Sequence, residues 1–569
     1  MRYKSKSISL ILPFIAFLFL SCNHSSDKMR SKEIVENPIG MNEYVLQNIK
    51  SALVIATDNN GIIEDSLQLK FYKVVEDFYY QRDYAPVWSD TQHFNSIADH
   101  LLTYLDTSIT DGLFKNDYHY ASLIKWKKIL TEDSLQKKDA VAWSKADLLF
   151  TDAFMNIICD LKQGRLFNDS ASWKNDTSKF NNFFHVNFKK YISEKTTATV
   201  LNAIQPQIKA YSELKKTILP FMKNMDTVQY TILDYSTEFE SEVDSFSFIN
   251  NLQLRFKESG YLNIKDTAIL DSMALASVIL KYQLKNKIKA DGKLSSSLIR
   301  NLNATDQVKL KRIFLTMDKY KQLPDSMPLK YVWVNIPAYK LNVFDNDTVR
   351  MTSKIICGKQ ATQTPVLNSE ISEIIIFPTW TVPASIIKKE MLPGLKKNPD
   401  YLTKKGLSLY DNKGELIDPM TVNWTKYSKG IPYQIKQGSG EKNALGVIKF
   451  NFQNPFDVYL HDTNQRYFFG NSMRALSHGC VRVQNWKGLA DFIVKNDSIN
   501  LTVGDKLNYN SDSISNWIAR KEKHKIAVKF RIPLFIRYIS CEGENGKVKF
   551  YDDIYDDDKR LIETYFVGK

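Results

Sequence analysis

The sequence is short of cysteine, with five in 569 residues. That is too few for a disulfide framework, so the chain is not one of the small secreted scaffolds that disulfides hold together. Cys159 and Cys357 lie in apolar runs typical of a helix and a strand, and we predict that both are small buried hydrophobic side chains.

Several metal and nucleic-acid motifs are also missing. The sequence has no Cys-x-x-Cys or His-x-x-x-His pair near its other candidate residues, and no zinc finger, RNP-like run or basic helix with heptads. The net charge of +14 comes from scattered basic residues. We therefore expect no nucleic-acid partner, and interpret the charge as solvated surface or as attraction to an acidic partner.

No apolar run is long enough for a comfortable membrane span. The longest candidate, Ile8 to Leu20, follows three basic residues and precedes Cys22, which is typical of a signal peptide over residues 1–22. The ending Phe19-Leu-Ser-Cys22 resembles a bacterial lipoprotein signal, which implies lipidation of Cys22, a periplasmic location and a membrane anchor. An ordinary signal peptide or an uncleaved anchor is the alternative.

The rest of the chain predicts a multidomain α+β protein. Helical patterns dominate its first half, and alternating strands dominate the region after Tyr331. The acidic run from Tyr551 to Asp558 fits no EF-hand spacing and is expected to be a solvated face. The predicted parts are a tether (23–46), a helical domain (47–250), a small helical module (251–305), a mostly β domain (328–510) with an insertion at about 387–435, and a C-terminal extension (511–569) that packs on one of the larger domains.

One stretch of the β domain carries residues suited to thiol chemistry. His461 precedes Cys480 by nineteen positions, Gly479 lies directly before the cysteine, and Arg482 follows it. A nucleophilic thiolate needs an imidazole to take its proton, and a glycine lets backbone N–H groups approach the developing oxyanion. Alternation before His461 predicts a strand with Tyr459 and His461 on one face.

Two simpler interpretations compete. Cys480 could be a buried structural thiol, although its polar neighbours make it poorly placed for that role. His461, His478 and Cys480 could instead bind zinc, but Arg482 would repel a cation there.

The whole run from His461-Asp-Thr through Ser477-His-Gly-Cys480-Val-Arg482-Val to Asn485 resembles the active-site signature of L,D-transpeptidases, the cysteine enzymes that cross-link peptidoglycan. Two further segments are similar to the opening of that family's catalytic domain: Asn335-Ile-Pro-Ala-Tyr339 and the run from Trp380 to Ile386. The helical half resembles the scaffold domain of the large Gram-negative members. The module at 251–305 is similar to a peptidoglycan-binding module. The alternative is a module that only packs against the rest of the chain and binds no ligand.

The resemblance implies roles for the residues. Cys480 is the nucleophile, His461 the base, and the N–H groups of Gly479 and Cys480 the oxyanion donors. The Asp462 carbonyl, or less favourably its side chain, orients the imidazole, while His478 fixes the turn. No metal or other cofactor is implied. The side chains expected to contact the substrate are Arg482, Asn485, His478, Ser477, Tyr459 and Trp380.

Three functions remain open. The first is transpeptidation, in which the Cys480 thioester of one peptidoglycan stem peptide is resolved by the amine of another into a 3→3 cross-link. The second is hydrolysis of the same thioester, an L,D-carboxypeptidase activity. The third is a non-catalytic lipoprotein that binds the wall. Carbapenem-type β-lactams are expected to acylate Cys480 in the first two cases.

Overall fold

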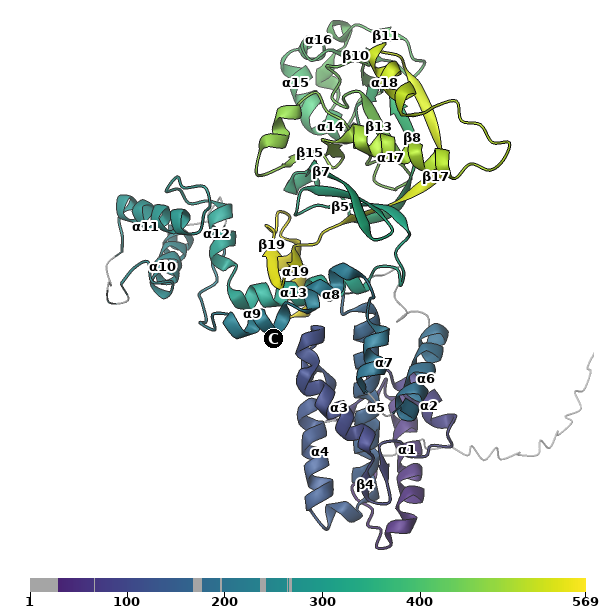
Figure 1. The fold of residues 1–569 in the computed structure, drawn as a ribbon. Coiled ribbons are helices and arrows are strands. Elements are labelled where there is room, and N and C mark those ends of the chain that lie inside the picture. Colours follow the sequence, from purple (N-terminus) through teal and green to yellow (C-terminus); the bar gives the residue numbers. More distant parts are fainter. Residues whose placement is uncertain are drawn as a thin grey trace, which may run out of the picture. The chain divides into compact units, whose positions relative to one another are not determined.

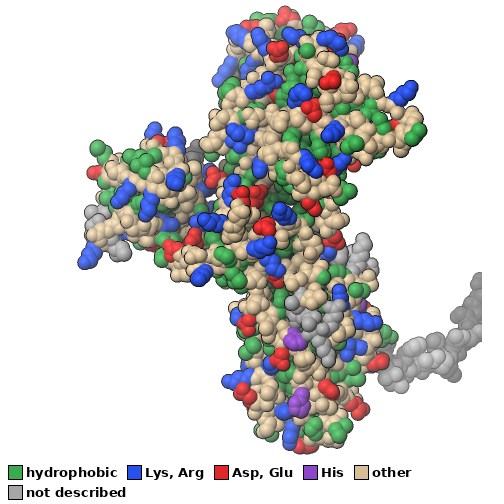
Figure 2. All heavy atoms as spheres, viewed as in Figure 1, with side chains coloured by type: hydrophobic (Ala, Val, Ile, Leu, Met, Phe, Trp, Pro, Cys, Tyr) green, Lys and Arg blue, Asp and Glu red, His purple; other side chains and the backbone are tan. Residues whose placement is uncertain are grey.

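The computed structural model describes residues 29–65, 67–166, 177–194, 197–235, 242–263, 265 and 269–568, and these residues form two compact units (Figure 1). The predicted signal peptide and Cys22 lie outside the described residues. No helix in the described ranges combines the length and apolar character that a membrane crossing would need. Figure 2 shows Lys and Arg side chains spread among Asp and Glu over the visible face, rather than gathered in one patch.

The first unit is a helical domain that comprises residues up to Thr107, Phe114–Cys159 and Asp169–Asn202. Two short hairpins connect its helices. Its elements are α1 (Met41–Asp58), β1 (Ile62–Glu64), β2 (Leu67–Gln68), α2 (Tyr72–Tyr80), β3 (Ser89–Asp90), β4 (His93–Phe94), α3 (Ser96–Thr107), α4 (Tyr120–Glu132), α5 (Ala140–Gln163, which continues past this unit), α6 (Thr177–Glu194) and α7 (Thr197–Ile204).

A buried carboxylate on α5 organises the aromatic core of this unit. Asp147 accepts hydrogen bonds from the Tyr79 hydroxyl at 2.5 Å, from Val87 N–H at 3.0 Å and from Trp88 N–H at 2.9 Å. The Trp88 ring stacks on Phe150 with ring centroids 5.3 Å apart. The aromatic-dense segment of the sequence is therefore core, and its loop is tied to α5 by one side chain.

Replacing Asp147 with alanine should destabilise this unit by about 3 kcal/mol, because it leaves the buried N–H groups of Val87 and Trp88 without their acceptor and removes the carboxylate partner of the Tyr79 hydroxyl. Asp147→Asn keeps an acceptor oxygen and should cost less. Hydrogen–deuterium exchange of peptides from α5 and residues 80–90 checks this, with peptides of the β domain as the internal control. Unchanged protection of α5 in the alanine variant would contradict it.

The second unit includes the small module, three helices around a core that includes Phe256, Ile279 and Leu302. Its helices are α10 (Glu242–Glu258), α11 (Ser272–Lys285) and α12 (Ser296–Asn303). Gln283 is 2% exposed, and its side-chain oxygen accepts the N–H groups of Asp291 and Gly292 at 3.0 and 2.8 Å. Gln283 thus holds the turn between α11 and α12.

A compact block surrounds α13 and receives the C-terminus. It contains α8 (Lys209–Lys215), α9 (Ile218–Asn224), α13 (Asp306–Lys321), β18 (Cys541–Glu544), β19 (Lys547–Phe550) and α19 (Asp557–Tyr565). The expectation of a solvated acidic run is wrong at Asp558, which is 1% exposed and pairs with Arg312 at 2.8 Å and Lys319 at 2.9 Å. The two cations compensate the buried carboxylate, and they come from a helix more than two hundred residues earlier.

The β domain is a closed, mostly antiparallel sheet. Its order is β7-β16-β14-β13-β8-β17-β5-β6, β6 pairs back with β7, and β15 pairs with β7 at the side. The strands are β5 (Lys330–Asn335), β6 (Lys340–Asp345), β7 (Thr348–Gly358), β8 (Leu367–Ile376), β13 (Ile448–Phe452), β14 (Leu460–His461), β15 (Ala475–Ser477), β16 (Val481–Val483) and β17 (His524–Arg537); α17 (Trp486–Ile499) packs on the sheet and α18 (Ser511–Ala519) follows.

The sequence placed the end of this domain at residue 510, whereas β17 lies inside the sheet, antiparallel to β8 and parallel to β5. In its first half the strand alternates buried residues with basic ones such as Lys525 and Lys529, and it contains Pro533. Alternation is typical of a strand with one exposed face, whereas a proline is unusual in a central strand. The sequence predicted a separate C-terminal extension that packs on one of the larger domains, and β17 instead belongs to the sheet.

The insertion in this domain folds around its own small core. Four short strands in the order β11-β10-β12-β9 pair with one another, and a π-helix over Ile387–Met391 leads into α15 (Leu392–Lys397) and α16 (Tyr401–Lys404). Leu395, Leu409 and Ile435 are buried at its centre. The strands are β9 (Trp380–Thr381), β10 (Leu407–Tyr410), β11 (Leu416–Ile417) and β12 (Gln434–Gln437).

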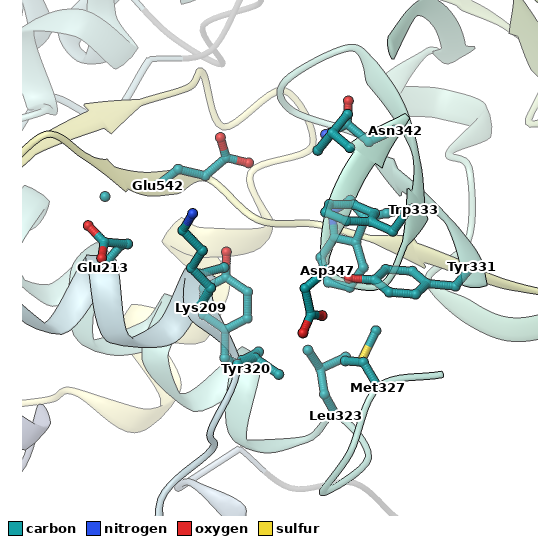
Figure 3. Close-up of a pocket in the computed structure, with 15 residues that line it drawn as sticks. Lys209, Glu213, Tyr320, Leu323, Met327, Tyr331, Trp333, Asn342, Asp347 and Glu542 are labelled. Atoms are coloured by element: carbon teal, nitrogen blue, oxygen red, sulfur yellow. The ribbon is translucent and has the colours of Figure 1, made fainter. Parts of the chain in front are cut away.

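A cavity of about 320 Å³ lies where α8 and α13 meet β5 and β6. Its lining includes Trp333 and Tyr320 together with Lys209, Glu213 and Glu542 (Figure 3). No cysteine or histidine lines it, so it is not the place for the predicted thiol chemistry.

Candidate active site

The predicted nucleophile and base lie on neighbouring parallel strands. Leu460 of β14 pairs with Val481 of β16, and His461 pairs with Arg482. The Val481 N–H donates to the Tyr459 carbonyl at 3.0 Å, which continues the register and places Cys480 opposite Tyr459. Leu460 and Val481 belong to the barrel core. Because side chains alternate along a strand, Tyr459, His461, Cys480 and Arg482 share the other face.

His461 is a buried, neutral imidazole. Its ring is 4% exposed, and its Nδ1 has no hydrogen-bond partner. Burial, together with the charges of Arg482 and Lys449, lowers the pKa of His461 to about 3, although backbone groups of Asp462 and Leu445 act in the opposite direction. The ring is thus held through its backbone partners, with Nδ1 available to accept a proton.

Cys480 is a free, half-buried thiol. Burial raises its pKa, whereas the Tyr459 backbone and hydroxyl and the positive charges of Lys449 and Arg482 lower it. The Trp380 side chain interacts in turn with the Tyr459 hydroxyl. Of the residues expected to contact substrate, Tyr459 therefore contacts the sulfur itself, and Trp380 contacts Tyr459.

The turn before the nucleophile needs a glycine. Gly479 has a φ of +120°, a conformation that other residues rarely adopt. Ser477 Oγ donates to the Cys480 carbonyl at 2.6 Å and accepts the Gly479 N–H at 3.2 Å. Within the described part of the chain the Cys480 N–H has no acceptor. The Cys480 N–H is thus the free donor for an oxyanion, while the Gly479 N–H must first leave Ser477.

Two residues that the sequence did not single out support this turn. Thr364 Oγ1 donates to the Gly479 carbonyl at 2.7 Å. The Tyr555 hydroxyl donates to the Gly358 carbonyl at 2.6 Å and accepts the Thr364 N–H at 3.1 Å. The C-terminal segment therefore contacts the nucleophile turn through Thr364. No local sequence pattern predicts this contact.

Removing the Tyr555 hydroxyl should loosen this turn. Tyr555→Phe leaves a buried N–H and a buried carbonyl without their partner, at a cost of about 1–3 kcal/mol each. We expect a several-fold lower acylation rate of Cys480 with the fold retained, measured as the rate of adduct formation with a reactive acyl donor. Tyr551→Phe, which removes a hydroxyl bound at 2.8 Å to Glu542 away from the turn, is the matched control. Equal rates in the two variants would contradict the assignment.

Asp462 contributes its backbone rather than its side chain to the imidazole. Its carboxylate binds Arg466 at 2.6 Å and accepts the Val447 N–H at 3.1 Å. A Cβ at Gly446, where φ is +65°, would lie 2.3 Å from that carboxylate. The side-chain alternative considered from the sequence therefore does not fit, because the carboxylate is already engaged in the loop.

His478 links the nucleophile turn to the insertion. Its Nε2 lies 2.5 Å from the Glu390 carboxylate on the π-helix, and Lys359 lies 3.6 Å from the same oxygen. Such a contact supports the predicted turn-fixing role. It also takes His478 away from a zinc site with Cys480, and within the described ranges no group of three or more potential ligands could hold a metal.

The remaining predicted substrate residues differ in position. Arg482 lies in the row beside His461, bonds Gln465 at 3.0 Å and leaves its Nε without a partner. Asn485 instead caps α17, where its side-chain oxygen accepts the Gly488 N–H at 3.1 Å. Sequence spacing alone could not separate these two because β16 ends between them.

Lys449 is a further charged residue beside His461 and Arg482, and the sequence did not identify it as a candidate. It lies on β13 directly opposite His461, and its Nζ is 3.9 Å from the centre of the Tyr459 ring. The signal was present in the strand Ile448–Phe452, where alternate residues are buried and Lys449 falls on the less buried face.

Known proteins resemble the two large parts of the chain. Residues 329–503 match the family model described as L,D-transpeptidase catalytic domain (YkuD), and residues 73–218 match a model described as scaffold domain. A Haemophilus influenzae protein named "Putative L,D-transpeptidase" is 32% identical over 230 residues, which are 40% of this chain and 45% of that protein. The match thus spans less than half of the relative's length.

Solved structures of L,D-transpeptidases also match. L,D-transpeptidase 1 of Mycobacterium tuberculosis is 11% identical, with 37% of this chain and 61% of that chain covered and a TM-score of 0.14. A mutant L,D-transpeptidase of Enterococcus faecium is 10% identical, with 57% and 98% covered and a TM-score of 0.15.

The matched range contains both β14 and β16, with the histidine on one strand and the cysteine at the start of the other. The chain is thus a multidomain α+β protein in which residues 329–503 match the L,D-transpeptidase catalytic domain of the YkuD type and residues 73–218, before it, match a scaffold domain.

Proposed function

We propose that the chain forms 3→3 cross-links between peptidoglycan stem peptides through a thioester on Cys480. The observation that carries the proposal is the shared face of β14 and β16, where a free thiol, a neutral imidazole and two cations lie together inside the matched catalytic domain. The residue types are those of nucleophilic acyl transfer.

Acylation starts with transfer of the thiol proton to His461 Nδ1. The sulfur attacks the carbonyl of the diaminopimelate L-centre in a tetrapeptide stem, and the C–S bond forms as the carbonyl oxygen takes the negative charge. The Cys480 N–H stabilises that charge. The C–N bond to the terminal D-Ala then breaks, and the proton held on His461 passes to the leaving amine.

Resolution of the thioester completes the cycle. A side-chain amine of a second stem loses a proton to His461 and attacks the thioester carbonyl, so that an amide forms and the thiol of Cys480 is regenerated. Water in place of the amine gives hydrolysis, the L,D-carboxypeptidase alternative. Arg482, with its unpartnered Nε, is the residue best placed to receive a stem carboxylate.

Product analysis tests this function. The purified chain is incubated with disaccharide-tetrapeptide, and products are identified by mass spectrometry. Cross-linked dimers with release of D-Ala support transpeptidation, whereas tripeptide alone supports hydrolysis. A chain that binds the wall without chemistry gives neither product and no carbapenem adduct on the Cys480 peptide.

The cellular setting is a separate part of the proposal. The lipoprotein-like ending at Cys22 supports a periplasmic location with a lipid anchor. Metabolic labelling with a fatty-acid probe tests this, and Cys22→Ala should lose the label while keeping catalytic activity in detergent extracts. Label retained by that variant would contradict the anchor.

A further inference from the structure

Lys449 and Cys480 contact the same tyrosine from different strands. The ammonium of Lys449 lies 3.9 Å from the centre of the Tyr459 ring, and the hydroxyl of that ring interacts with the Cys480 sulfur. Tyr459 also packs edge-on against the His461 ring, with ring centroids 5.5 Å apart. The four side chains therefore form one cluster on one face of β13, β14 and β16.

The ammonium of Lys449 has no anionic partner within the described ranges. The carboxylate on the neighbouring strand, Glu373, is engaged with Lys525 at 2.8 Å and with Asn451 at 2.7 Å. A partly buried cation without a counter-ion is costly to the fold. We therefore expect Lys449 to pair with an anion that forms at only one stage of the reaction.

His461 cannot be the resident cation of this cluster. In many thiol enzymes an imidazolium stabilises the thiolate. Here the ring lies buried between Arg482 on one strand and Lys449 on the other, and both charges oppose its protonation. At neutral pH the positive charge of the cluster therefore comes from Lys449, whose pKa is lowered by burial, and from Arg482, which is hydrogen-bonded to Gln465.

We propose that the Lys449 ammonium stabilises the Cys480 thiolate across the Tyr459 ring, so that the sulfur gives up its proton to His461 more readily than a buried thiol otherwise would. Lys449 is then a positioning residue, because its charge acts on the reacting sulfur without contacting the substrate. The inference rests on the proposed function only in taking the sulfur as nucleophile. Attraction at short range in a partly buried site is large enough to move a thiol pKa by about one unit.

The pH dependence of Cys480 alkylation tests whether Lys449 stabilises the thiolate. The titratable and charged groups around it are Lys449 on β13, Tyr459 and His461 on β14, Arg482 on β16, and His478 with Glu390 at the turn and the insertion. The full chain is alkylated with iodoacetamide from pH 5 to 10, and modification is read on the Cys480 peptide by mass spectrometry, which separates it from the other thiols.

Lys449→Met should move the half-maximal pH of alkylation up by about one unit, which slows modification at pH 7 about tenfold while the high-pH plateau stays. Lys449→Arg keeps the charge and should stay within about twofold of the wild type. Lys529→Met is the matched control, because Lys529 lies on β17 of the same sheet and pairs with Asp505 rather than with Glu373. It removes the same charge two strands away and should leave the profile unchanged.

Two results would overturn the proposal. One is a Lys449→Met profile that coincides with that of Lys529→Met while thermal unfolding shows both variants folded. The other is equal loss in the methionine and arginine variants, which would indicate a packing role. Since alkylation needs no stem peptide, absence of cross-linking would refute the proposed function and leave this inference standing on its own test.

Discussion

Cys480→Ala should abolish cross-link formation, with a loss of about 10⁴-fold or more in kcat/KM. The side chain removed is the proposed nucleophile, and the other three cysteines in the described part of the chain are buried. Cys357, on β7 of the same sheet, is fully buried, and burial raises its pKa to about 12. The variant should also lose its carbapenem adduct, measured as the intact mass of the protein after incubation with the drug.

Two comparisons separate chemistry from folding. Cys480→Ser keeps the shape of the turn but presents a hydroxyl that gives up its proton far less readily, so activity should fall nearly as far as in the alanine variant. Cys541→Ser, at a buried thiol whose Sγ lies 3.2 Å from Thr316 Oγ1, keeps that contact and should keep full activity and the adduct. Cross-linking retained by Cys480→Ala would remove the thioester mechanism altogether.

The central residues of the site could be predicted, because the patterns that identify them lie within short stretches of the sequence. Alternation before His461 gives the strand and its polar face, and the Gly479-Cys480 pair marks a turn whose φ of +120° requires glycine. The sequence predicted that the two segments lie together, but proximity of two residues does not set strand direction, so their parallel pairing comes from the structure. The same alternation could have identified Lys449, since the strand Ile448–Phe452 has the same pattern of burial.

The supports of the site could not be predicted because their partners are distant in the sequence. Tyr555 contacts Gly358 across nearly two hundred positions, and the buried Asp558 is compensated by Arg312 and Lys319 of a distant helix. An acidic run without such a partner would indeed be solvated. Asn485 shows the opposite case, a residue of suitable type whose side chain was already needed to cap α17.

His461→Gln should lower the rate of Cys480 acylation by about 10²- to 10⁴-fold, the usual contribution of a general base. Glutamine fills most of the space and keeps a hydrogen-bonding group, but it cannot accept the thiol proton or return it to the leaving amine. Stopped-flow measurement of thioester formation with a chromogenic acyl donor checks this. His478→Gln, at the other histidine of the run, breaks the contact with Glu390 and should cost less than about tenfold.

The pH profile of the wild type distinguishes the role of His461 further. Because its pKa is lowered to about 3, the imidazole is neutral and able to act as base throughout pH 5 to 8. Acylation should therefore show no inflection from His461 near its ordinary pKa of about 6.5, and any rise with pH should follow the thiol. His461→Gln should lower the curve without moving that rise. An inflection near pH 6.5 that disappears in His461→Gln would mean that Lys449 and Arg482 do not hold the ring neutral, and the electrostatic account of the site would fail with it.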